Sequence, residues 1–287
     1  MIVKEKIPNF ELLFTMIKTD FKLRYYGSVL GFFWSLLKPL LMFLVLYTVF
    51  TVFIRWNVPN FQLYLLLGII IWNFFSEATV NGINSLQNKS AILKKVYFPR
   101  IFVVISSTAT SFLVFLLNLS VFFVFYLFSG LGFSFEMIIF PFYVVLIYFF
   151  ALGLSLILSI VQVYFKDMIQ IWEVALSAGF YLSPIIYPLA LVPREYWKFL
   201  FINPITGIVQ YSRILLIDHN FPSFYGSLYL LFFIFCVLIF GFFVFKKYSK
   251  HIIEKLGIKL LLQIKFRKSF YYLLKKKRVF VNYFFRL

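Results

Sequence analysis

Aromatic side chains are the most abundant groups in this sequence that could recognise a ligand. They make up 23% of its 287 residues. The candidates that offer ring faces to a ligand are Phe43, Tyr47, Phe50, Trp172, Phe180 and Tyr181. Phe43, Tyr47 and Phe50 follow i, i+4, i+7 spacing and would share one face of a helix. Such rings stack on the C–H faces of sugars, so the pattern predicts a glycan-contacting wall, although ordinary core packing gives the same spacing.

Catalytic and metal-binding patterns are absent from the sequence. The ten acidic residues are scattered, and Cys236 is the only cysteine. His219 and His251 fall in segments predicted to lie on opposite sides of a membrane, so they cannot share a metal ion. No GxxxxGK[ST] phosphate loop occurs. We therefore expect no enzyme activity, no metal, no cofactor and no ATP hydrolysis by this chain itself.

Glu173 is the one acidic residue inside a predicted membrane span. Carboxylates within a membrane are costly and usually face a bundle interior or water. Because Glu173 follows Lys166 and Asp167 by only one to two turns, it could instead lie at the membrane interface. The sequence leaves both readings open.

The composition is that of a membrane protein. The hydrophobic fraction is 63% and the mean hydropathy is +0.94. Only 13% of the residues are charged, against about 25% in soluble domains. The net charge of +18 does not indicate nucleic-acid binding, because the basic residues flank apolar blocks and do not form a patch on a soluble fold.

Six apolar blocks are long enough to be predicted as spans, since crossing the hydrocarbon takes about 20 residues. They are Val29–Phe53, Phe61–Ser76, Ile101–Phe128, Met137–Phe165, Met168–Pro188 and Tyr225–Phe245. Spanning elements are helices or closed barrels, and these blocks lack the alternating polarity of barrel strands. The predicted fold class is therefore an all-α integral membrane protein with about six transmembrane helices.

The distribution of Lys and Arg predicts the orientation of the spans. Basic residues gather before the first span, in the loop from Lys89 to Arg100 and after Phe245. By the positive-inside rule both termini lie in the cytoplasm and the protein sits in the inner or plasma membrane. The sequence thus divides into a cytoplasmic amphipathic segment (1–28), a six-span domain (29–245) and a basic amphipathic cytoplasmic tail (246–287).

Three segments are predicted not to span. Pro8–Ser28 has apolar residues at helical spacing between basic ones, which is typical of an interfacial helix. Thr79–Arg100 is expected to form a short helix lying across the cytoplasmic membrane face. Between spans five and six, two short apolar stretches flank Asn203-Pro204 and predict re-entrant or outer-surface helices.

Four runs, in this order, resemble the membrane permeases of polysaccharide-exporting ABC transporters, which export O-antigen, capsule or teichoic acid. The runs are DFKLRYYGSVLGFFWSLLKPLL (20–41), NKSAILKKVYFPR (88–100), VYFKD continuing to YLSPIIYP (163–188) and NPITGIVQYSR (203–213). The resemblance covers roughly residues 20 to 245. The tail after that has no counterpart in the family pattern.

The resemblance implies an ATP-driven export mechanism. Two permease copies would form the channel, and two ABC ATPase subunits would dock on the cytoplasmic face. The expected partners are thus a second copy of the chain, the ATPase, a lipid-linked glycan and membrane lipids, but no nucleic acid. The implied entrance residues are Arg24, Tyr25, Tyr26 and Trp34, where Arg suits a lipid pyrophosphate. The implied ATPase-coupling residues are Asn84, Ser85, Leu86, Gln87, Lys94 and Lys95.

Other functions compete with glycan export. A drug, lipid or small-molecule exporter of the same superfamily would need fewer aromatic residues on the channel face. A membrane-embedded glycan polymerase would need clustered catalytic residues, and the outer loop offers only Arg194, Glu195, Arg213 and Asp218. A scaffold without a transport role is disfavoured by the inner coupling segment. The sequence does not identify the glycan or say whether the ATPase carries a carbohydrate-binding domain.

Overall fold

A computed structural model describes residues 9–27, 29–56, 58–95, 98–249 and 252. Its regular elements are all helices, and no described residue lies in a strand. The α-helices are α1 (Asn9–Tyr25), α2 (Phe33–Thr48), α3 (Phe61–Asn88), α4 (Ser90–Lys95), α5 (Ile101–Phe128), α6 (Phe140–Tyr164), α7 (Met168–Leu182), α8 (Trp197–Leu200), α9 (Pro204–Leu216) and α10 (Phe224–Tyr248). Short π or 3-10 turns are η1 (Val49–Phe53), η2 (Phe135–Ile139), η3 (Leu189–Leu191) and η4 (Arg194–Tyr196).

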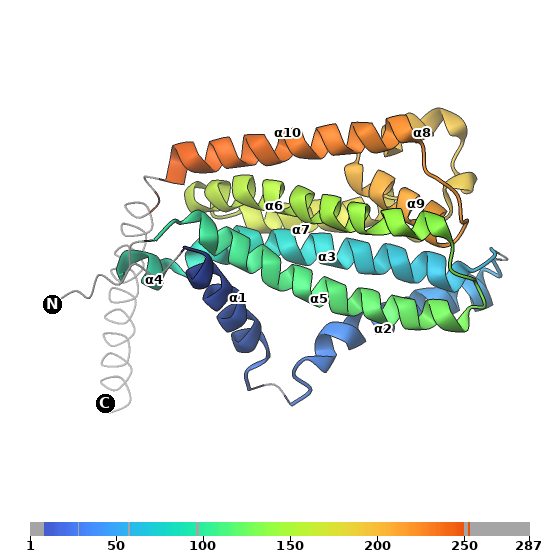
Figure 1. Cartoon of the computed structure of the whole chain (residues 1–287), viewed down its shortest axis with the longest axis horizontal. Helices are drawn as coiled ribbons and strands as arrows, with labels where there is room; N and C mark the ends of the chain where they lie inside the picture. Colours follow the sequence, from blue (N-terminus) through green and yellow to red (C-terminus); the bar gives the residue numbers. More distant parts are fainter. Residues whose placement is uncertain (1–8, 28, 57, 96–97, 250–251, 253–287) are drawn as a thin grey trace, which may run out of the picture.

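Five helices of the described chain are long and apolar enough to cross a membrane. They are Phe33–Phe53, α3, α5, Phe135–Tyr164 and α10. The count rises to six if the bent pair Arg194–Leu200 and Pro204–Leu216 is one span. This confirms the predicted all-α, multi-pass membrane fold. In Figure 1 the long helices α3, α5, α6 and α10 run side by side along the molecule.

Helix α3 is the centre of the bundle. Within the apolar stretch of each helix, the buried share is 72% for α3, 22% for α10 and 6% for Phe33–Phe53, which contains α2. It packs against α5 and α6 along its length and also contacts α2, α7 and α9. The helices with open apolar faces, α2 and α10, are those that would contact lipid or another subunit.

The inner part of α3 differs from the predicted arrangement. The first part of the segment Thr79–Arg100, expected to be a short helix on the membrane face, is the continuous end of α3, which runs to Asn88. No proline interrupts this stretch, and Gly82 serves close packing: a Cβ there would lie 2.4 Å from Ser155 of α6. At 28 residues α3 is about 42 Å long, so it exceeds the ~30 Å hydrocarbon core. The separate short helix at this end is α4.

The predicted fifth span is helical only in its first part. Helix α7 ends at Leu182, because Ser183 precedes a proline and adopts extended backbone (φ −83°, ψ 140°). Residues Ser183 to Ile186 are nevertheless buried. Non-helical backbone at this depth must find its hydrogen bonds within the protein.

The segment between α7 and α10 folds into short helices, as the Asn203-Pro204 pair indicated. The η4–α8 piece and α9 are bent by 115° at their junction. Asn203 caps α9 by accepting a hydrogen bond from the Ile205 amide at 3.1 Å, with proline at the first helical position. Helix α9 is buried on almost every side.

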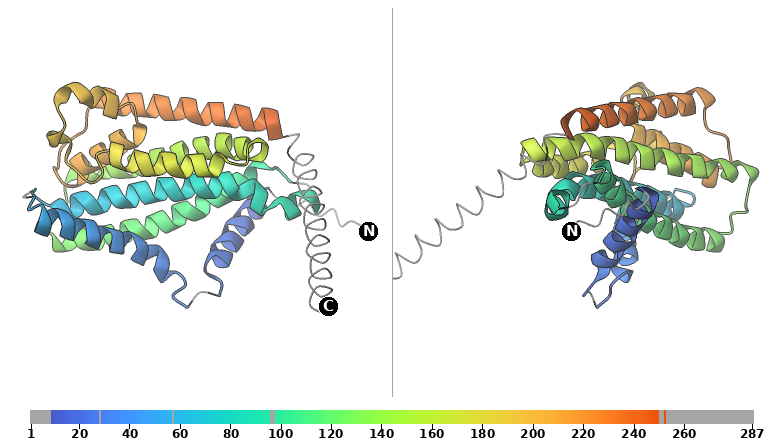
Figure 2. Two further views of the ribbon diagram at one scale, coloured as in Figure 1. Left: turned by 180° about the vertical axis from the view of Figure 1, so that it is seen from behind. Right: turned by 60° about the vertical axis from the view of Figure 1, so that its left-hand side comes forward.

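Helices α1 and α2 leave the bundle and approach each other as the two arms of a V (Figure 1). Gly27 (φ 78°) and Gly31 (φ 45°) adopt the left-handed backbone that this turn requires. Phe10 and Phe14 of α1 are exposed, as expected for a helix at a membrane surface. Figure 2 shows α1 crossing one end of the bundle obliquely, where it packs against α5.

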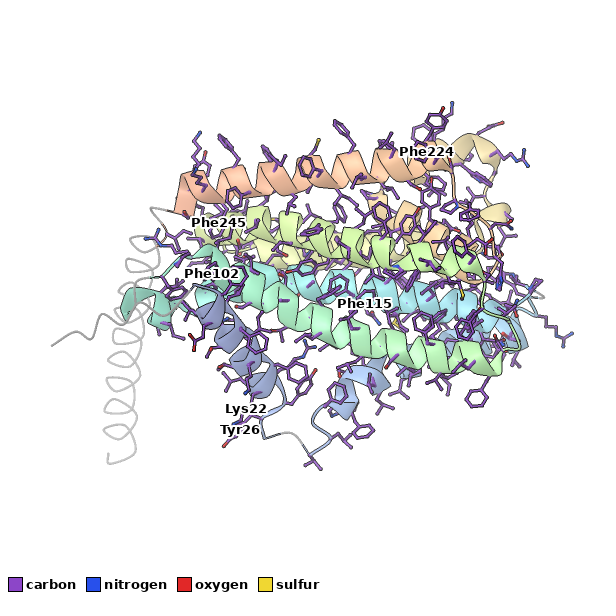
Figure 3. All side chains as sticks on the ribbon, in the orientation of Figure 1. Lys22, Tyr26, Phe102, Phe115, Phe224 and Phe245 are labelled. Carbon is purple, nitrogen blue, oxygen red and sulfur yellow. The ribbon has the colours of Figure 1, made fainter. Side chains whose placement is uncertain are left out.

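Helix α10 lies against α6 through two glycines. A Cβ on Gly241 would lie 2.4 Å from the backbone oxygen of Gly153. Phe224 and Phe245 mark the two ends of α10 in Figure 3. Phe245 is buried and Phe224 is exposed. Apart from Ser249 and Ile252, the predicted tail beyond α10 lies outside the described residues.

Candidate functional site

A cleft of about 880 Å³ lies between the V of α1 and α2 on one side and α3, α5 and α7 on the other. Its walls combine charged, hydroxyl and amide side chains with aromatic rings. The apolar and polar groups are mixed, so the cleft suits an amphipathic or hydroxyl-rich molecule better than a purely apolar one.

The aromatic part of the cleft comes from five helices. The rings are Tyr25 of α1, Trp34 of α2, Trp72 and Phe74 of α3, Phe115 of α5, and Phe180 and Tyr181 of α7. Phe74 and Phe115 stack with centroids 4.5 Å apart, and Trp72 contacts Phe180 at 6.0 Å. Trp34 and Tyr181 are 50% and 69% exposed, so their ring faces are open to a ligand.

The charged centre of the cleft is an ion pair between α1 and α3. Arg24 donates from Nη1 and Nη2 to the two carboxylate oxygens of Glu77 at 2.5 and 2.6 Å. The two side chains are 27% and 34% exposed. Burial opposes the charge on Arg24, but the hydrogen bond and the charge of Glu77 outweigh it and raise the pKa of Arg24. The bidentate geometry fixes the end of α1 to the middle of α3.

Two further charges line the same cleft. Lys38 of α2 and Glu173 of α7 are both exposed, and neither forms an ion pair with another described residue. The structure thus places Glu173 on the cleft wall, a choice that the sequence had left open. The hydroxyl of Tyr25, also in the lining, has no hydrogen-bond partner within the described chain.

A second, polar pocket of about 360 Å³ adjoins the first between α1, α3 and α5. Its lining includes Asn81, Asn88, Ser107 and Thr110. Lys89 pairs here with Asp20 of α1 and also donates to the Ser106 hydroxyl at 2.8 Å.

The predicted site residues fall into two groups. The cleft brings together Arg24, Tyr25, Trp34, Phe180 and Tyr181, which come from three separate stretches of sequence. The residues outside its lining are Tyr26, Phe43, Tyr47, Phe50 and Trp172. Tyr26 points away from the bundle beside Lys22 at the end of α1 (Figure 3) and is 80% exposed. Trp172 donates from its indole nitrogen to the Thr79 hydroxyl at 2.9 Å.

The stripe on α2 packs against its own bundle. Phe43 stacks on Tyr47 at 5.5 Å, and Tyr47 stacks on Phe61 at 6.2 Å. Phe50 contacts Trp56 at 4.7 Å. The spacing that predicted a shared face is correct, and the face is used for packing near the start of α3.

The predicted coupling residues lie at one end of the bundle but differ in exposure. Ser85 and Leu86 are buried within the packing of α3. Asn84 is half-buried, and Gln87 donates to the Gln162 carbonyl of α6 at 3.3 Å. Lys94 and Lys95 are on α4, the short helix that follows α3.

Sequence reasoning missed two charged residues. The predicted second span ends at Ser76, so Glu77 falls just outside it. In the structure the same helix continues to Asn88 and includes Glu77. Arg213 appeared only as a loop residue, whereas it is 2% exposed within α9. It donates to the carbonyls of Tyr64, Pro184 and Ile185, which include those of the broken stretch after α7.

Residues 11–217 match the family model described as ABC-2 type transporter. A relative from Myxococcus xanthus, named O-antigen export system permease protein RfbA, is 30% identical over 77% of this chain and 86% of its own length. A Klebsiella pneumoniae protein of the same name is 28% identical over 70% of this chain and 78% of its own length. The Escherichia coli polysialic acid transport protein KpsM is 24% identical over 64% of this chain and 72% of its own length.

Proposed function

Because this chain belongs to the ABC-2 type transporter family of membrane proteins, we propose that it is the channel-forming permease subunit of an ABC transporter that exports a lipid-linked polysaccharide. The names of the relatives, which refer to O-antigen export and polysialic acid transport, support this substrate class. The observation that carries the proposal is the cleft, which combines open aromatic rings with charged and hydroxyl groups between the helices of the bundle.

The two parts of the cleft suit the two parts of such a substrate. Trp34 and Tyr181 present exposed rings that would stack on sugars without forming a deep well. A conduction path needs sites weak enough for the cargo to leave. Arg24 and Tyr25 would meet the phosphate and first sugars at the mouth of the cleft, since a guanidinium forms bidentate contacts with phosphate.

ATP hydrolysis is assigned to a separate ABC ATPase. Two ATPase copies and two copies of this chain would form the transporter. The apolar face of α2, of which little is buried by the chain itself, is available for lipid or for the second copy. Helix α4, which carries Lys94 and Lys95, would meet the ATPase and pass its closure to α3 and α1.

The orientation follows from the charges at one end of the bundle. The described starts of α1 and α4 and the described end of α10 lie at the same end (Figure 1). Lys89, Arg100, Lys246 and Lys247 lie at this end, which we assign to the cytoplasm. Both termini are then cytoplasmic, and the outer end carries the bent helix pair.

Neither alternative gains support from a specific contact. A polymerase reading rests on Arg194, Glu195, Arg213 and Asp218, and the donors of Arg213 are engaged by backbone carbonyls. The depletion experiment described next distinguishes a small-molecule exporter from the proposed glycan exporter.

The test is depletion of this protein in its native cell, followed by separation of lipid-linked glycans from the two membrane faces. Long glycan chains trapped on the cytoplasmic side are expected, and their sugars would identify the cargo. Short, unpolymerised units would point to a polymerase. Unchanged surface glycan without a trapped intermediate would refute glycan export and favour a small-molecule cargo.

A further inference from the structure

The ion pair between Arg24 and Glu77 lines both cavities. It belongs to the wall of the 880 Å³ cleft and to the wall of the 360 Å³ polar pocket. No other residue is shared by the two linings. The pair therefore stands where the two spaces meet.

The two cavities differ in the side chains that line them. The polar pocket is lined by four charged groups and by amides and hydroxyls, with Leu23 as its apolar member. The cleft carries the tryptophans and phenylalanines. The pocket also lies toward the end of α3 that carries Lys89, which is the end assigned to the cytoplasm. A hydrophilic group moving from that end into the cleft would meet the polar pocket first.

We propose that the Arg24–Glu77 pair is a gate between the polar pocket and the aromatic cleft, and that Glu77 is the group which an incoming phosphate oxyanion replaces on Arg24. The second part rests on the proposed function, because it takes the oxyanion from the lipid carrier's phosphate. Glu77 is then a positioning residue: it holds Arg24 across the passage until a competing anion arrives.

The geometry of the pair supports competition. Both Nη atoms of Arg24 are engaged by the one carboxylate, at 2.5 and 2.6 Å. A guanidinium edge binds one bidentate oxyanion at a time, and a phosphate fits it as well as a carboxylate does. The buried Tyr25 hydroxyl, which has no partner among the described residues, lies on the cleft lining beside Arg24 and could donate to the same anion.

A separate contact keeps α1 attached when the gate opens. Asp20, one turn before Arg24, pairs with Lys89, which is held in turn by the Ser106 hydroxyl of α5. The pair at Arg24 can therefore break while α1 remains fixed to α3 and α5 by the Asp20 contact. Opening of the Arg24–Glu77 pair alone therefore costs less free energy than release of the whole helix α1.

The gate is tested by cysteine labelling in inside-out membrane vesicles, without any glycan. In a chain carrying Cys236→Ser, Asn73→Cys places a thiol on the cleft wall. A membrane-impermeant maleimide added to the cytoplasmic side should label it slowly. Glu77→Gln should speed labelling about tenfold, equivalent to about 1.4 kcal/mol. The charge swap Arg24→Glu with Glu77→Arg should return the rate most of the way to that of the unmodified pair.

Two controls separate the gate from general loosening. Glu173→Gln removes a carboxylate from the same cleft that is in no ion pair with a described residue, and it should leave the labelling rate unchanged. Lys247→Cys, exposed on α10 at the cytoplasmic end of the bundle, should label readily and should not respond to Glu77→Gln. Equal labelling of Asn73→Cys with and without Glu77→Gln would overturn the gate, as would a charge swap that labels as fast as the single variant.

Inorganic pyrophosphate tests the replacement step in the same vesicles. It should speed labelling when the pair is intact and have no further effect in Glu77→Gln. If Glu77→Gln opens the gate and pyrophosphate does not, the gate stands and the assignment of phosphate as the opening group is overturned. Because no glycan is present, this outcome is distinct from failure of export in the cell.

Discussion

Arg213→Met is the substitution with the clearest expected effect on stability. The guanidinium of Arg213 is 2% exposed and donates four hydrogen bonds to three backbone carbonyls. The bonds to Pro184 and Ile185 are 2.6 and 2.7 Å long, and that from Nη2 to Tyr64 is 2.9 Å. The guanidinium also stacks on the Tyr64 ring at 3.3 Å. Methionine fills a similar space without a donor.

The magnitude follows from the hydrogen bonds that three carbonyls lose, although the Pro184 carbonyl keeps a second donor, Nε2 of Gln210, at 3.3 Å. A hydrogen bond from a charged group contributes roughly 1.5–3 kcal/mol, so the contacts to three carbonyls contribute roughly 5–9 kcal/mol. The substitution also removes the desolvation penalty of a buried charge, which is several kcal/mol. We expect a net loss of roughly 2–5 kcal/mol. At about 2–4 °C per kcal/mol, the apparent Tm should fall by roughly 4–20 °C.

The assay is thermal unfolding of the purified protein in detergent, with Arg213→Lys as the matched variant. Lysine keeps the charge but lacks the planar fork that reaches separate carbonyls, so it should recover only part of the loss. Gly68→Ala approaches the same contact from α3, since a Cβ there would lie 2.6 Å from Nη2 of Arg213. If both Arg213→Met and Gly68→Ala leave the Tm unchanged, the broken stretch after α7 does not depend on Arg213.

Three further predictions concern packing, substrate contact and docking. Gly241→Ala should separate α10 from α6 and lower the apparent Tm, because the added Cβ would lie 2.4 Å from the Gly153 carbonyl oxygen. Thermal unfolding in detergent measures this change. Tyr181→Ala should reduce surface glycan at normal protein levels, because its exposed ring lines the cleft; quantitative glycan blotting measures this. Reversing the charges of Lys94 and Lys95 to Glu should weaken co-purification of the ATPase, because both lie on α4 at the inner end.

The first two of these predictions have a control in the same chain. Gly132→Ala should leave the Tm unchanged, since no atom lies within 4 Å of the added Cβ. Tyr47→Ala removes a packed ring, stacked on Phe43 and Phe61, and should lower the Tm as well as export. Normal export by Tyr181→Ala would remove this residue from the glycan path. Unchanged ATPase recovery with the reversed lysines would place docking elsewhere.

The spans were predictable because membrane insertion depends on the local sequence. Long apolar blocks with few charges identify helices whatever their neighbours, and five of the six predicted spans match long helices of the structure. The end of α3 was missed because its residues after Ser76 are polar, although they continue a helix. Polar composition marks the membrane boundary, whereas only a backbone breaker ends the helix.

The cleft was predictable only in part. Arg24, Tyr25, Trp34, Phe180 and Tyr181 were chosen for the chemistry of their side chains and the family resemblance, and they line one space. Spacing could not separate the ring stripe on α2 from a ligand wall, since packing and binding use the same residue types. The direction in which a helix face points depends on the neighbouring helices.

Composition and charge distribution alone determined that this chain is an all-α membrane protein with basic residues toward one side, because transfer of a segment into lipid depends on that segment's own residues. Tertiary structure alone decided which polar groups meet. Arg24 pairs with Glu77 across 53 positions, and Arg213 reaches the Tyr64 carbonyl across 149. A charge in a low-dielectric bundle must find its partner in space, and the approach of distant helices, which no local pattern encodes, determines that partner.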